Sequence, residues 1–364
     1  MFSFSVEARS GRARAGRLVT PHGALDTPAF MPVGTAGAVK AVTVGDLREV
    51  GAQVLLANTY HLMLRPGDEL VAALGGLHGF TPWAGPWLTD SGGYQVMSLA
   101  RLRTLDENGV TFRSHLDGAA HVLTPERSMQ VQMNLGADVI VAFDECPTLP
   151  APREVVAAAA ERTTRWAERS RRAHHRADQW LFGVVQGGVD PDLRERSARE
   201  IVALGFPGHA VGGLAVGEAK PDTMRVVAQM DGLLPEEKPR YLMGVGTPED
   251  LVEAVARGVD LFDCVLPTRN ARNGQLFTRE GRLSIRNARY RADPRPPDPG
   301  CRCPTCASAS RAYLRHLHLA GEMSAATLMT VHNLFFYLDT LRSMRQSILL
   351  GRFEAFREEM LRAV

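Results

Sequence analysis

Short, nearly continuous apolar runs recur along the chain, and each of them ends in glycine or in polar residues. Strands of a parallel sheet have this pattern, because helices cover both faces of such a sheet and bury them. The runs therefore predict eight strands. They lie at Ala29–Thr35, Val54–Tyr60, Trp87–Gly93, Ala137–Glu145, Trp180–Gln186, Ala210–Ala215, Tyr241–Thr247 and Val259–Thr268.

Helical spacing of apolar residues separates most of these runs. Thr124–Gly136 opens with Thr-Pro-Glu, which offers a capping side chain and then a proline and an acid in the first turn. Repeated alternation of strand and helix predicts an α/β fold, a (β/α)8 TIM barrel. An open doubly wound sheet is the alternative, but unusual polar residues follow several different runs, which favours a barrel. The other expected helices are Arg153–Ala173, Asp190–Leu204, Pro221–Met230 and Pro248–Arg257.

Three segments depart from the alternation. Residues 1–28 alternate polar and apolar positions, which predicts a small antiparallel cap over the bottom of the barrel. Residues 109–123 contain Asp117-Gly118 between two alternating runs, which indicates a hairpin. Residues 286–335 hold prolines, clustered cysteines and a histidine, and a last helix is expected at Leu338–Leu361.

These patterns divide the chain into three expected parts. Residues 1–285 form the barrel with its N-terminal cap, residues 286–335 form a zinc-binding subdomain inserted near the C-terminus after the eighth strand, and residues 336–364 form the final barrel helix.

Composition is that of a globular protein, with 45% apolar and 23% charged residues. No run of eighteen apolar residues occurs, so no membrane-spanning helix is expected. The first residues lack a basic and then apolar signal pattern, so we expect a cytoplasmic protein. Five cysteines, an odd number, make a disulfide framework improbable in that compartment.

The formal net charge is only +2, so any binding of nucleic acid has to come from a local patch. Between residues 269 and 295 there are eight arginines and two acids, directly after the last apolar run. A solvated charged face is the ordinary explanation. Its position beside that strand favours instead a polyanionic substrate that enters at this edge.

A metal site is predicted by Cys301-x-Cys303-x-x-Cys306 together with His332. Three thiolates and one imidazole suit tetrahedral Zn²⁺, and four protein ligands make a closed, structural site. Free thiols in a loop are the alternative. His316 and His318 lie nearer in sequence to the cysteines, so the identity of the histidine ligand stays open.

Asp90, Asp144 and Asp263 each end or interrupt an apolar run. A buried carboxylate is costly unless it is paired or functional, although loop capping or a structural role would also explain one alone. Three of them at the carboxyl ends of different strands would meet at one barrel mouth. Two or more carboxylates facing one cavity suit chemistry at an anomeric carbon, so glycosyl transfer or hydrolysis is the leading class.

Glycine follows two of the expected strands, in residues 185–188 and 212–218. Glycine lets the backbone approach a ligand closely, so free amides and the Gln186 side chain would suit a flat ligand with a carbonyl group. A phosphate cradle is the weaker alternative.

Six motifs, in the family's order and covering nearly the whole chain, resemble the bacterial tRNA-guanine transglycosylases, also called queuine tRNA-ribosyltransferases. They are Thr89–Gln95, Phe143–Cys146, Val185–Gly188, Gly212–Glu218, Phe262–Arg269 and the cysteine cluster with its histidine.

The resemblance implies that guanine at the wobble position of GUN-anticodon tRNAs is exchanged for a 7-deazaguanine. Asp263 matches the nucleophile that attacks ribose C1′, and Asp90 matches the general acid/base. Two displacements would give net retention. A catalytically silent RNA-binding paralogue and a zinc-stabilised barrel glycosidase are the rival interpretations; the intact Asp90 and Asp263 argue against the first, and the arginine-rich edge against the second.

The resemblance also implies how the base is bound. Asp144 would accept from N1–H and the exocyclic amine, while Gln186 and the Gly213 amide would donate to O6, and Tyr94 and Met243 would stack on the ring. The full expected set for substrate is Asp90, Ser91, Gly92, Gly93, Tyr94, Asp144, Gln186, Gly213, Leu214 and Met243.

For tRNA, Arg269 and Arg272 match residues near the anticodon backbone. Thr247 departs from the family, which often has lysine there, and this puts one phosphate contact in doubt. The full expected set for RNA is Gly244, Val245, Gly246, Thr247, Thr268, Arg269, Asn270, Ala271 and Arg272.

Val216 and Cys146 follow the bacterial pattern, so we expect preQ1 (7-aminomethyl-7-deazaguanine) as the incoming base, in queuosine biosynthesis. Bacterial relatives pair as homodimers through the zinc region, and Tyr313 and His316 match interface positions. One zinc ion is expected per subunit. Because the chain ends at Val364, we expect no further RNA-binding region of the archaeal kind.

Overall fold

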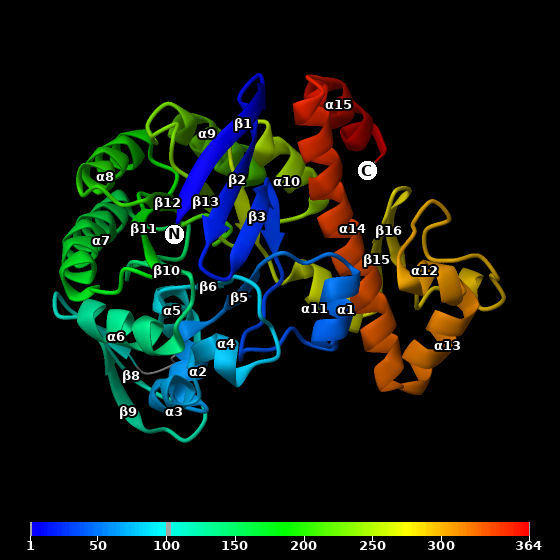
Figure 1. Cartoon of the computed structure of the whole chain (residues 1–364), viewed down its shortest axis with the longest axis horizontal. Helices are drawn as coiled ribbons and strands as arrows, with labels where there is room; N and C mark the ends of the chain where they lie inside the picture. The colour runs from blue at the N-terminus through cyan, green and yellow to red at the C-terminus, as the bar shows by residue number, and fades with distance from the viewer. Residues whose placement is uncertain (1, 100–102, 364) are drawn as a thin grey trace.

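Eight parallel strands form the centre of the computed structural model, which describes residues 2–99 and 103–363. Their order is β4-β14-β13-β12-β11-β10-β6-β5, and a parallel bridge between Val33 and Leu56 closes the ring. The expected (β/α)8 barrel is therefore confirmed (Figure 1). The strands are β4 (Ala29–Met31), β5 (Leu55–Ala57), β6 (Trp87–Thr89), β10 (Val139–Val141), β11 (Trp180–Val185), β12 (Gly208–Val211), β13 (Arg240–Leu242) and β14 (Leu261–Asp263).

Most strands are shorter than the apolar runs that predicted them. The run that starts at Trp87 stops pairing after Thr89, and the run that starts at Val259 stops pairing after Asp263. Most residues that follow the paired part of these two runs are buried, in loops and short helices at the carboxyl end of the barrel, although Val265 is exposed. Burial therefore continues beyond the end of the strand. These ends carry the polar residues that the sequence singled out.

An antiparallel sheet precedes the barrel, as expected, and comprises β1 (Ser3–Ser10), β2 (Ala13–Thr20) and β3 (Gly23–Thr27). Leu18 and Leu25 of this sheet pack in one apolar cluster with strand residues such as Leu56, Phe182 and Tyr241. Since β3 leads directly into the start of β4, the sheet covers the N-terminal end of the strands. The barrel is therefore sealed at that end.

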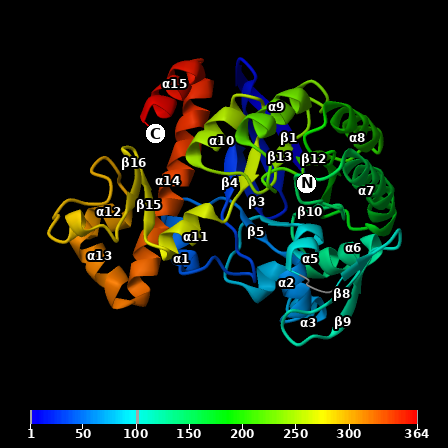
Figure 2. The ribbon, with the colours of Figure 1, turned by 180° about the vertical axis from the view of Figure 1, so that it is seen from behind.

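The expected helices are present around the strands (Figures 1 and 2). Helix α6 (Pro125–Leu135) begins after Thr124, whose hydroxyl accepts from the Arg127 N–H at 3.1 Å, and it ends at Gly136 in the left-handed region (φ 68°). The others are α7 (Arg153–Ala173), α8 (Pro191–Ala203), α9 (Lys220–Asp231) and α10 (Pro248–Val255).

Several short elements between β4 and α6 were not predicted. They are the helices α1 (Val44–Glu49), α2 (Thr59–Leu64), α3 (Asp68–Ala73), α4 (Gly76–Phe80) and α5 (Gly93–Leu99) and the strand β7 (Arg103–Leu105). The hairpin of β8 (Val110–Arg113) and β9 (Ala120–Leu123) is confirmed. Its loop spans residues 114–119, so Asp117-Gly118 belongs to a longer connection than a two-residue turn.

The segment after β14 contains α11 (Leu266–Arg272), the hairpin β15 (Gln275–Thr278) and β16 (Gly281–Ser284), the 3₁₀ turn η1 (Ala288–Tyr290), α12 (Pro304–Ser308) and α13 (Arg311–Ala320). Helix α14 (Met323–Leu349) then runs between this segment and the barrel, and α15 (Phe353–Ala363) ends the chain (Figures 1 and 2).

The single final helix expected at Leu338–Leu361 is wrong. Helix α14 starts at Met323 and continues through the expected boundary at residues 335 and 336. The break falls at residues 350–352, where Gly351 has φ 65° and turns the chain into α15. The helix is uninterrupted because it has two partners: Ala325 and Met329 pack in the C-terminal segment, whereas Leu341 and Met344 pack in the barrel core. Within the described residues, no helix is both long and apolar enough to cross a membrane.

Candidate active site

Asp263 is the last residue of β14 and lies at the carboxyl end of the barrel. Its Oδ1 accepts two hydrogen bonds, from the Tyr241 hydroxyl at 2.6 Å and from the Gly244 N–H at 2.8 Å. Burial raises the pKa of Asp263, although both hydrogen bonds oppose this rise. The carboxylate is therefore held in place by neutral donors and carries a proton more readily than an aspartate in water.

Asp90 follows β6 and is 7% exposed. Its Oδ1 accepts from the Thr59 N–H at 2.9 Å, and its Oδ2 accepts from the side-chain amides of Gln95, at 2.8 Å, and Asn58. Burial raises the pKa of Asp90 to about 6, and the charge of Asp263 acts in the same direction. A carboxyl group with this pKa can both give and take a proton near neutral pH.

Asp144 follows β10 and is also buried. The Ser91 hydroxyl donates to its Oδ1 at 2.8 Å, and the Gln186 side-chain amide donates to its Oδ2 at 2.7 Å. Burial raises the pKa of Asp144 as well. Gln186 follows β11, so this contact joins the ends of neighbouring strands.

The three carboxylates share one environment. Burial raises the pKa of the Tyr241 hydroxyl well above 10, and the charges of Asp263, Asp90 and Asp144 raise it further. Among the described residues, no arginine, lysine or histidine forms an ion pair with any of the three. A mouth lined with uncompensated carboxyl groups suits a reaction in which positive charge develops on the substrate.

Two glycines shape the wall beside Asp144. A Cβ at Gly93 would lie 2.4 Å from the Asp144 carbonyl oxygen, and a Cβ at Gly213 (φ 65°) would lie 2.2 Å from the Gln186 Oε1. No larger residue fits at either position without a shift of the wall. Ser91, Gly92 and Leu214 are buried beside them, whereas Met243 is half-buried and Tyr94 is 50% exposed. The expected base-binding residues therefore run from a buried floor to an open rim.

The expected RNA-binding residues are mixed in exposure. Arg269 on α11 and Gly244 are exposed, Arg272 and Asn270 are half-buried, and Ala271 is fully buried in an apolar cluster. The remaining members are buried: Val245, Gly246, Thr247 and Thr268.

Thr247 has a local structural role. Its N–H and hydroxyl donate to Asp250 at 2.9 and 2.8 Å, which forms a capping box at the start of α10. Lys220 pairs with the same carboxylate, its Nζ lying 2.8 Å from Asp250 Oδ1. A cation is thus present beside position 247, although that position itself is uncharged.

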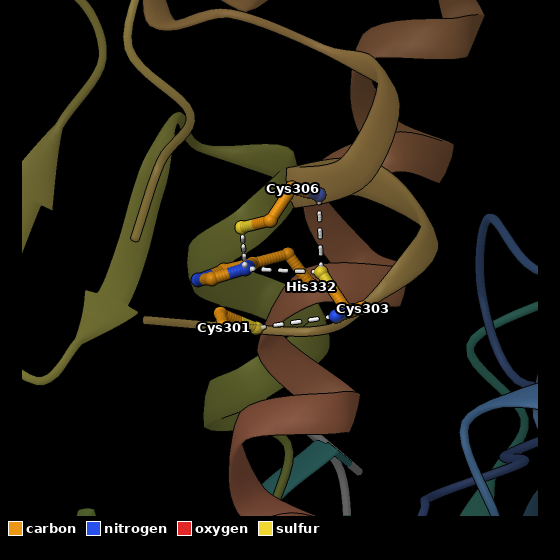
Figure 3. Close-up of side chains that lie close together, drawn as sticks. All are labelled: Cys301, Cys303, Cys306 and His332. Carbon is orange, nitrogen blue, oxygen red and sulfur yellow. Dashed lines mark hydrogen bonds between the residues drawn. The ribbon is translucent and has the colours of Figure 1, made fainter. Parts of the chain in front are cut away.

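The residues that could hold a metal are brought together as expected (Figure 3). The sulfur atoms of Cys301, Cys303 and Cys306 and one ring nitrogen of His332 lie within 4.8 Å of one another. His332 Nδ1 lies 3.4 Å from Cys303 Sγ and 3.3 Å from Cys306 Sγ. These separations are those of neighbouring ligands around a tetrahedral ion.

His332 is also prepared for coordination by its other nitrogen. Nε2 lies 2.8 Å from the Phe277 carbonyl oxygen, which fixes the proton on Nε2 and leaves the lone pair of Nδ1 directed at the sulfurs. Of the other candidates, His318 instead accepts from the Arg286 side chain at 3.0 Å. The cluster therefore fits a closed, structural Zn²⁺ site with His332 as the fourth ligand.

A second group of potential ligands, His22, His78 and Asp138, lies at the sealed end of the barrel. The two rings stack face to face with centroids 3.4 Å apart and planes 13° apart. Lone pairs of parallel stacked rings do not converge on one ion. Asp138 accepts from His22 at 2.8 Å and from the Trp87 N–H at 2.9 Å, so this cluster fits a hydrogen-bonded structural role.

Several residues at the mouth were missed by sequence reasoning: Asn58, Thr59, Gln95, Tyr241 and Arg194. Asn58 and Thr59 lie in the second apolar run, and Tyr241 opens the seventh. For these three residues the apolar pattern predicted burial, but it did not indicate which carboxylate each of them would contact.

A parallel (β/α)8 barrel with uncompensated carboxylates at the carboxyl ends of its strands defines the class of barrel enzymes, and this one also has a Cys₃His cluster that could hold a metal. Comparison with known proteins specifies the family. A model of the family "Queuine tRNA-ribosyltransferase" matches residues 9–364. The chain therefore belongs to the queuine tRNA-ribosyltransferase family and is an enzyme, a transglycosylase.

Individual relatives agree with this result. A queuine tRNA-ribosyltransferase of Thermus thermophilus is 59% identical over 361 residues, which cover 99% of this chain and 94% of that protein. The protein of the same name from Pelotomaculum thermopropionicum is 55% identical, over 99% of this chain and 98% of that protein. The one from Moorella thermoacetica is 56% identical, over 97% and 95%.

Proposed function

We propose that this enzyme exchanges guanine at the wobble position of GUN-anticodon tRNAs for preQ1, by double displacement, in queuosine biosynthesis. The observation that carries the proposal is the pair Asp90 and Asp263, a buried and a half-buried aspartate at one barrel mouth with raised pKa values and neutral hydrogen-bond partners.

In the first displacement, a carboxylate oxygen of Asp263 attacks ribose C1′. The bond from C1′ to N9 of guanine breaks, its electron pair goes to the base, and Asp90 supplies the proton that the departing base takes up. The product is an ester between Asp263 and the ribose, and the tRNA backbone stays intact. Oδ1 of Asp263 is occupied by Tyr241 and Gly244, so we assign the attack to Oδ2.

In the second displacement, Asp90 takes a proton from the incoming base. The base attacks C1′, the ester bond breaks, and Asp263 is released as a carboxylate. Each displacement inverts C1′, so the exchanged nucleotide has the original configuration. A pKa of about 6 lets Asp90 act first as acid and then as base.

Asp144 and Gln186 recognise the base in this proposal. Asp144 accepts from N1–H and the exocyclic amine, while the Gln186 side chain and the Gly213 amide donate to O6. Tyr94 and Met243, at the more open part of the wall, stack on the ring. Support comes from the contact of 2.7 Å between Gln186 and Asp144, which holds both groups side by side.

The tRNA lies along the exposed edge that begins at α11, with Arg269 and Arg272 near its phosphates. Lys220 is placed to supply the charge that Thr247 lacks. We further propose a cytoplasmic homodimer that pairs through the zinc region, with Tyr313, which is 50% exposed, and His316 at the interface.

Zinc, one ion per subunit, would be held by Cys301, Cys303, Cys306 and His332, and it supplies structure rather than chemistry. Cys303→Ser should lose bound zinc together with thermal stability. Metal content by plasma emission spectroscopy and a melting curve test this, with Cys146→Ser as the control because that cysteine lies apart from the cluster. Full zinc retention in Cys303→Ser would contradict the assignment.

The exchange itself is tested with radiolabelled guanine and an unmodified GUN tRNA. Incorporation of label, and formation of a denaturation-resistant adduct between enzyme and tRNA, are the expected results. Asp263→Ala should form no adduct. No incorporation by the wild-type protein would favour a silent RNA-binding protein, whereas turnover of free nucleosides without RNA would favour a glycosidase.

The incoming base is tested separately. Mass spectrometry of tRNA incubated with preQ1 or with queuine should show the preQ1 mass shift as the faster product. Faster incorporation of queuine would reverse the assignment that rests on Val216 and Cys146.

A further inference from the structure

Arg194, in the first half of α8, is completely buried, with 0% exposure. Among the described residues, no carboxylate forms an ion pair with it. Instead, its guanidinium donates to three main-chain carbonyl oxygens, of Gly188 at 2.7 Å, Val185 at 2.9 Å and Gly213 at 3.3 Å. Burying a cation without an ion-pair partner is costly, and burial lowers the pKa of Arg194 to about 10, although the charge of Glu218 acts in the opposite direction.

Two of these carbonyls, of Gly188 and Gly213, belong to the two loops that form the wall beside Asp144, and the third belongs to Val185, the last residue of β11. One loop follows β11 and carries Gln186, and the other follows β12 and carries Gly213. The glycines in these loops have left-handed backbone angles, with φ 127° at Gly187, 55° at Gly188 and 65° at Gly213. Glycine adopts these angles at little cost, but it also adopts others. Contacts from another part of the chain are therefore needed to hold the two loops in one conformation.

A rigid guanidinium fork that reaches both loops is such a constraint. The helix that carries it also approaches closely: a Cβ at Gly187 would lie 2.8 Å from the Arg194 backbone nitrogen. Ser197, one turn further along α8, accepts from the Gln186 N–H at 3.1 Å. The start of α8 therefore holds the Gln186 loop at several points.

The contact with Gly213 also sets the direction of a main-chain donor. In a planar trans peptide, the C=O and the following N–H point in opposite directions. Since the Gly213 carbonyl points at Arg194, the N–H of Leu214 points away from the guanidinium. Arg194 thus fixes the orientation of the peptide bond between Gly213 and Leu214, with the carbonyl toward α8 and the N–H away from it.

We propose that Arg194 is a positioning residue for base specificity, which holds the loops of Gln186 and Gly213 in the shape that selects the purine. This inference rests on the proposed function, because the purine is the substrate assigned there. The inference predicts separate effects on the base and on the tRNA. The loops that Arg194 holds lie beside Asp144, whereas Arg269 and Arg272, which are proposed to lie near the tRNA phosphates, are on α11.

The test compares Arg194→Met with Arg194→Lys and with the control Arg199→Met. Arg199 lies on the same helix but is exposed and pairs with Glu195. For Arg194→Met, the KM for guanine should rise about tenfold or more, while the KM for tRNA changes less than about twofold. Arg194→Lys, which keeps the charge and part of the hydrogen bonding, should lie between Met and wild type.

A purely structural role would lower the amount of folded enzyme and hence kcat, and it would leave both KM values unchanged. That result would overturn the proposal. If Arg194→Met does not fold, Arg194→Lys decides, and an unchanged KM for guanine in that variant overturns the proposal equally.

Equilibrium dialysis with guanine alone gives the same comparison without turnover. Weaker binding by Arg194→Met than by Arg199→Met is expected, and equal binding would overturn the inference. Failure of the wild-type protein to exchange guanine into tRNA would count against the proposed function instead, and dialysis would still decide the role of Arg194.

Discussion

Buried aspartates occur at both ends of the barrel, but their partners differ. At the sealed end, Asp260 is paired with Arg14, and both side chains are fully buried. Asp138 lies between two histidines there, and although burial alone would raise its pKa, hydrogen bonds from His78, the Trp87 backbone and His22 lower it. At the open end, Asp90 and Asp263 have only neutral donors, and their pKa values are raised.

The difference separates stability from reactivity. A carboxylate with a buried cation is stable as an anion and gains nothing by reacting. A carboxylate held by amides and hydroxyls stays less stable as an anion, so it can share a proton or bond to an electron-deficient carbon. The partners of each carboxylate, more than burial itself, therefore distinguish the two ends.

The largest expected effect is the loss of exchange in Asp263→Asn. The amide cannot form the ester, so the rate should fall about 10⁴-fold or more, while the melting temperature stays close to that of the wild type because no cation loses its partner. Guanine exchange and a thermal melt measure the two quantities. If Asp263→Asn still exchanged guanine, the proposal that the aspartates of the open end serve reactivity would be contradicted.

Asp260→Ala should have the opposite effect, a loss of stability with exchange activity preserved. Arg14 would be left buried without its partner, and the free energy of unfolding should fall by about 3–5 kcal/mol. Urea unfolding measures this loss, and exchange per folded molecule should be preserved. The double variant Arg14→Met with Asp260→Leu is the control; it should be more stable than Asp260→Ala, and equal instability would show that the cation is not the cause.

Asp90 should make the folded state less stable as the pH rises. Its pKa is about 6 in the folded chain against 3.8 in an unfolded one, so the folded state holds the proton longer. Between these values stability decreases as pH rises, by about 3 kcal/mol at most. Asp90→Asn should flatten the slope in that window and abolish exchange; an unchanged slope would mean that other groups cause it.

The smallest effect is expected at Asp138, with the opposite sign. Because its pKa is lowered, the stability that it contributes is present above about pH 4 and is lost as pH falls through its folded-state value. Asp138→Asn should cost about 1–3 kcal/mol at neutral pH and remove this acid-side loss. Urea titrations at several pH values compare it with Asp90→Asn, and slopes of the same sign would contradict the comparison.

Local pattern predicted the long elements and missed the short ones. Helix α7 has the bounds that the sequence predicted, because 21 residues give the helical period enough turns to be recognised. Helices such as α1 and α4 have six and five residues, too few for a period to appear. The end of α14 depended on Gly351 and on packing against two different parts of the chain, which no local window contains.

For the site, the sequence singled out three carboxylates that lie at the open end of the barrel, but not the residues that surround them. Asp90, Asp144 and Asp263 stand out because an acid is unusual beside apolar residues. Except for Gln95, which lies five positions from Asp90, their side-chain donors are ordinary residue types far away in sequence: Asn58 lies 32 positions from Asp90, and Tyr241 lies 22 from Asp263. Only the pairing of neighbouring strands, β5 with β6 and β13 with β14, brings such residues together.

The packed N-terminal end of the barrel determines how a small ligand can enter and leave the site. Leu18 and Leu25 close the N-terminal end of the barrel, and side chains such as Phe182 and Tyr241 fill its interior. Small molecules therefore reach the site from the carboxyl end of the strands. In the proposed exchange, the released purine would therefore leave through the same opening by which its replacement arrives. The outgoing base would have to leave the mouth before the next base enters, while the tRNA stays bonded to Asp263.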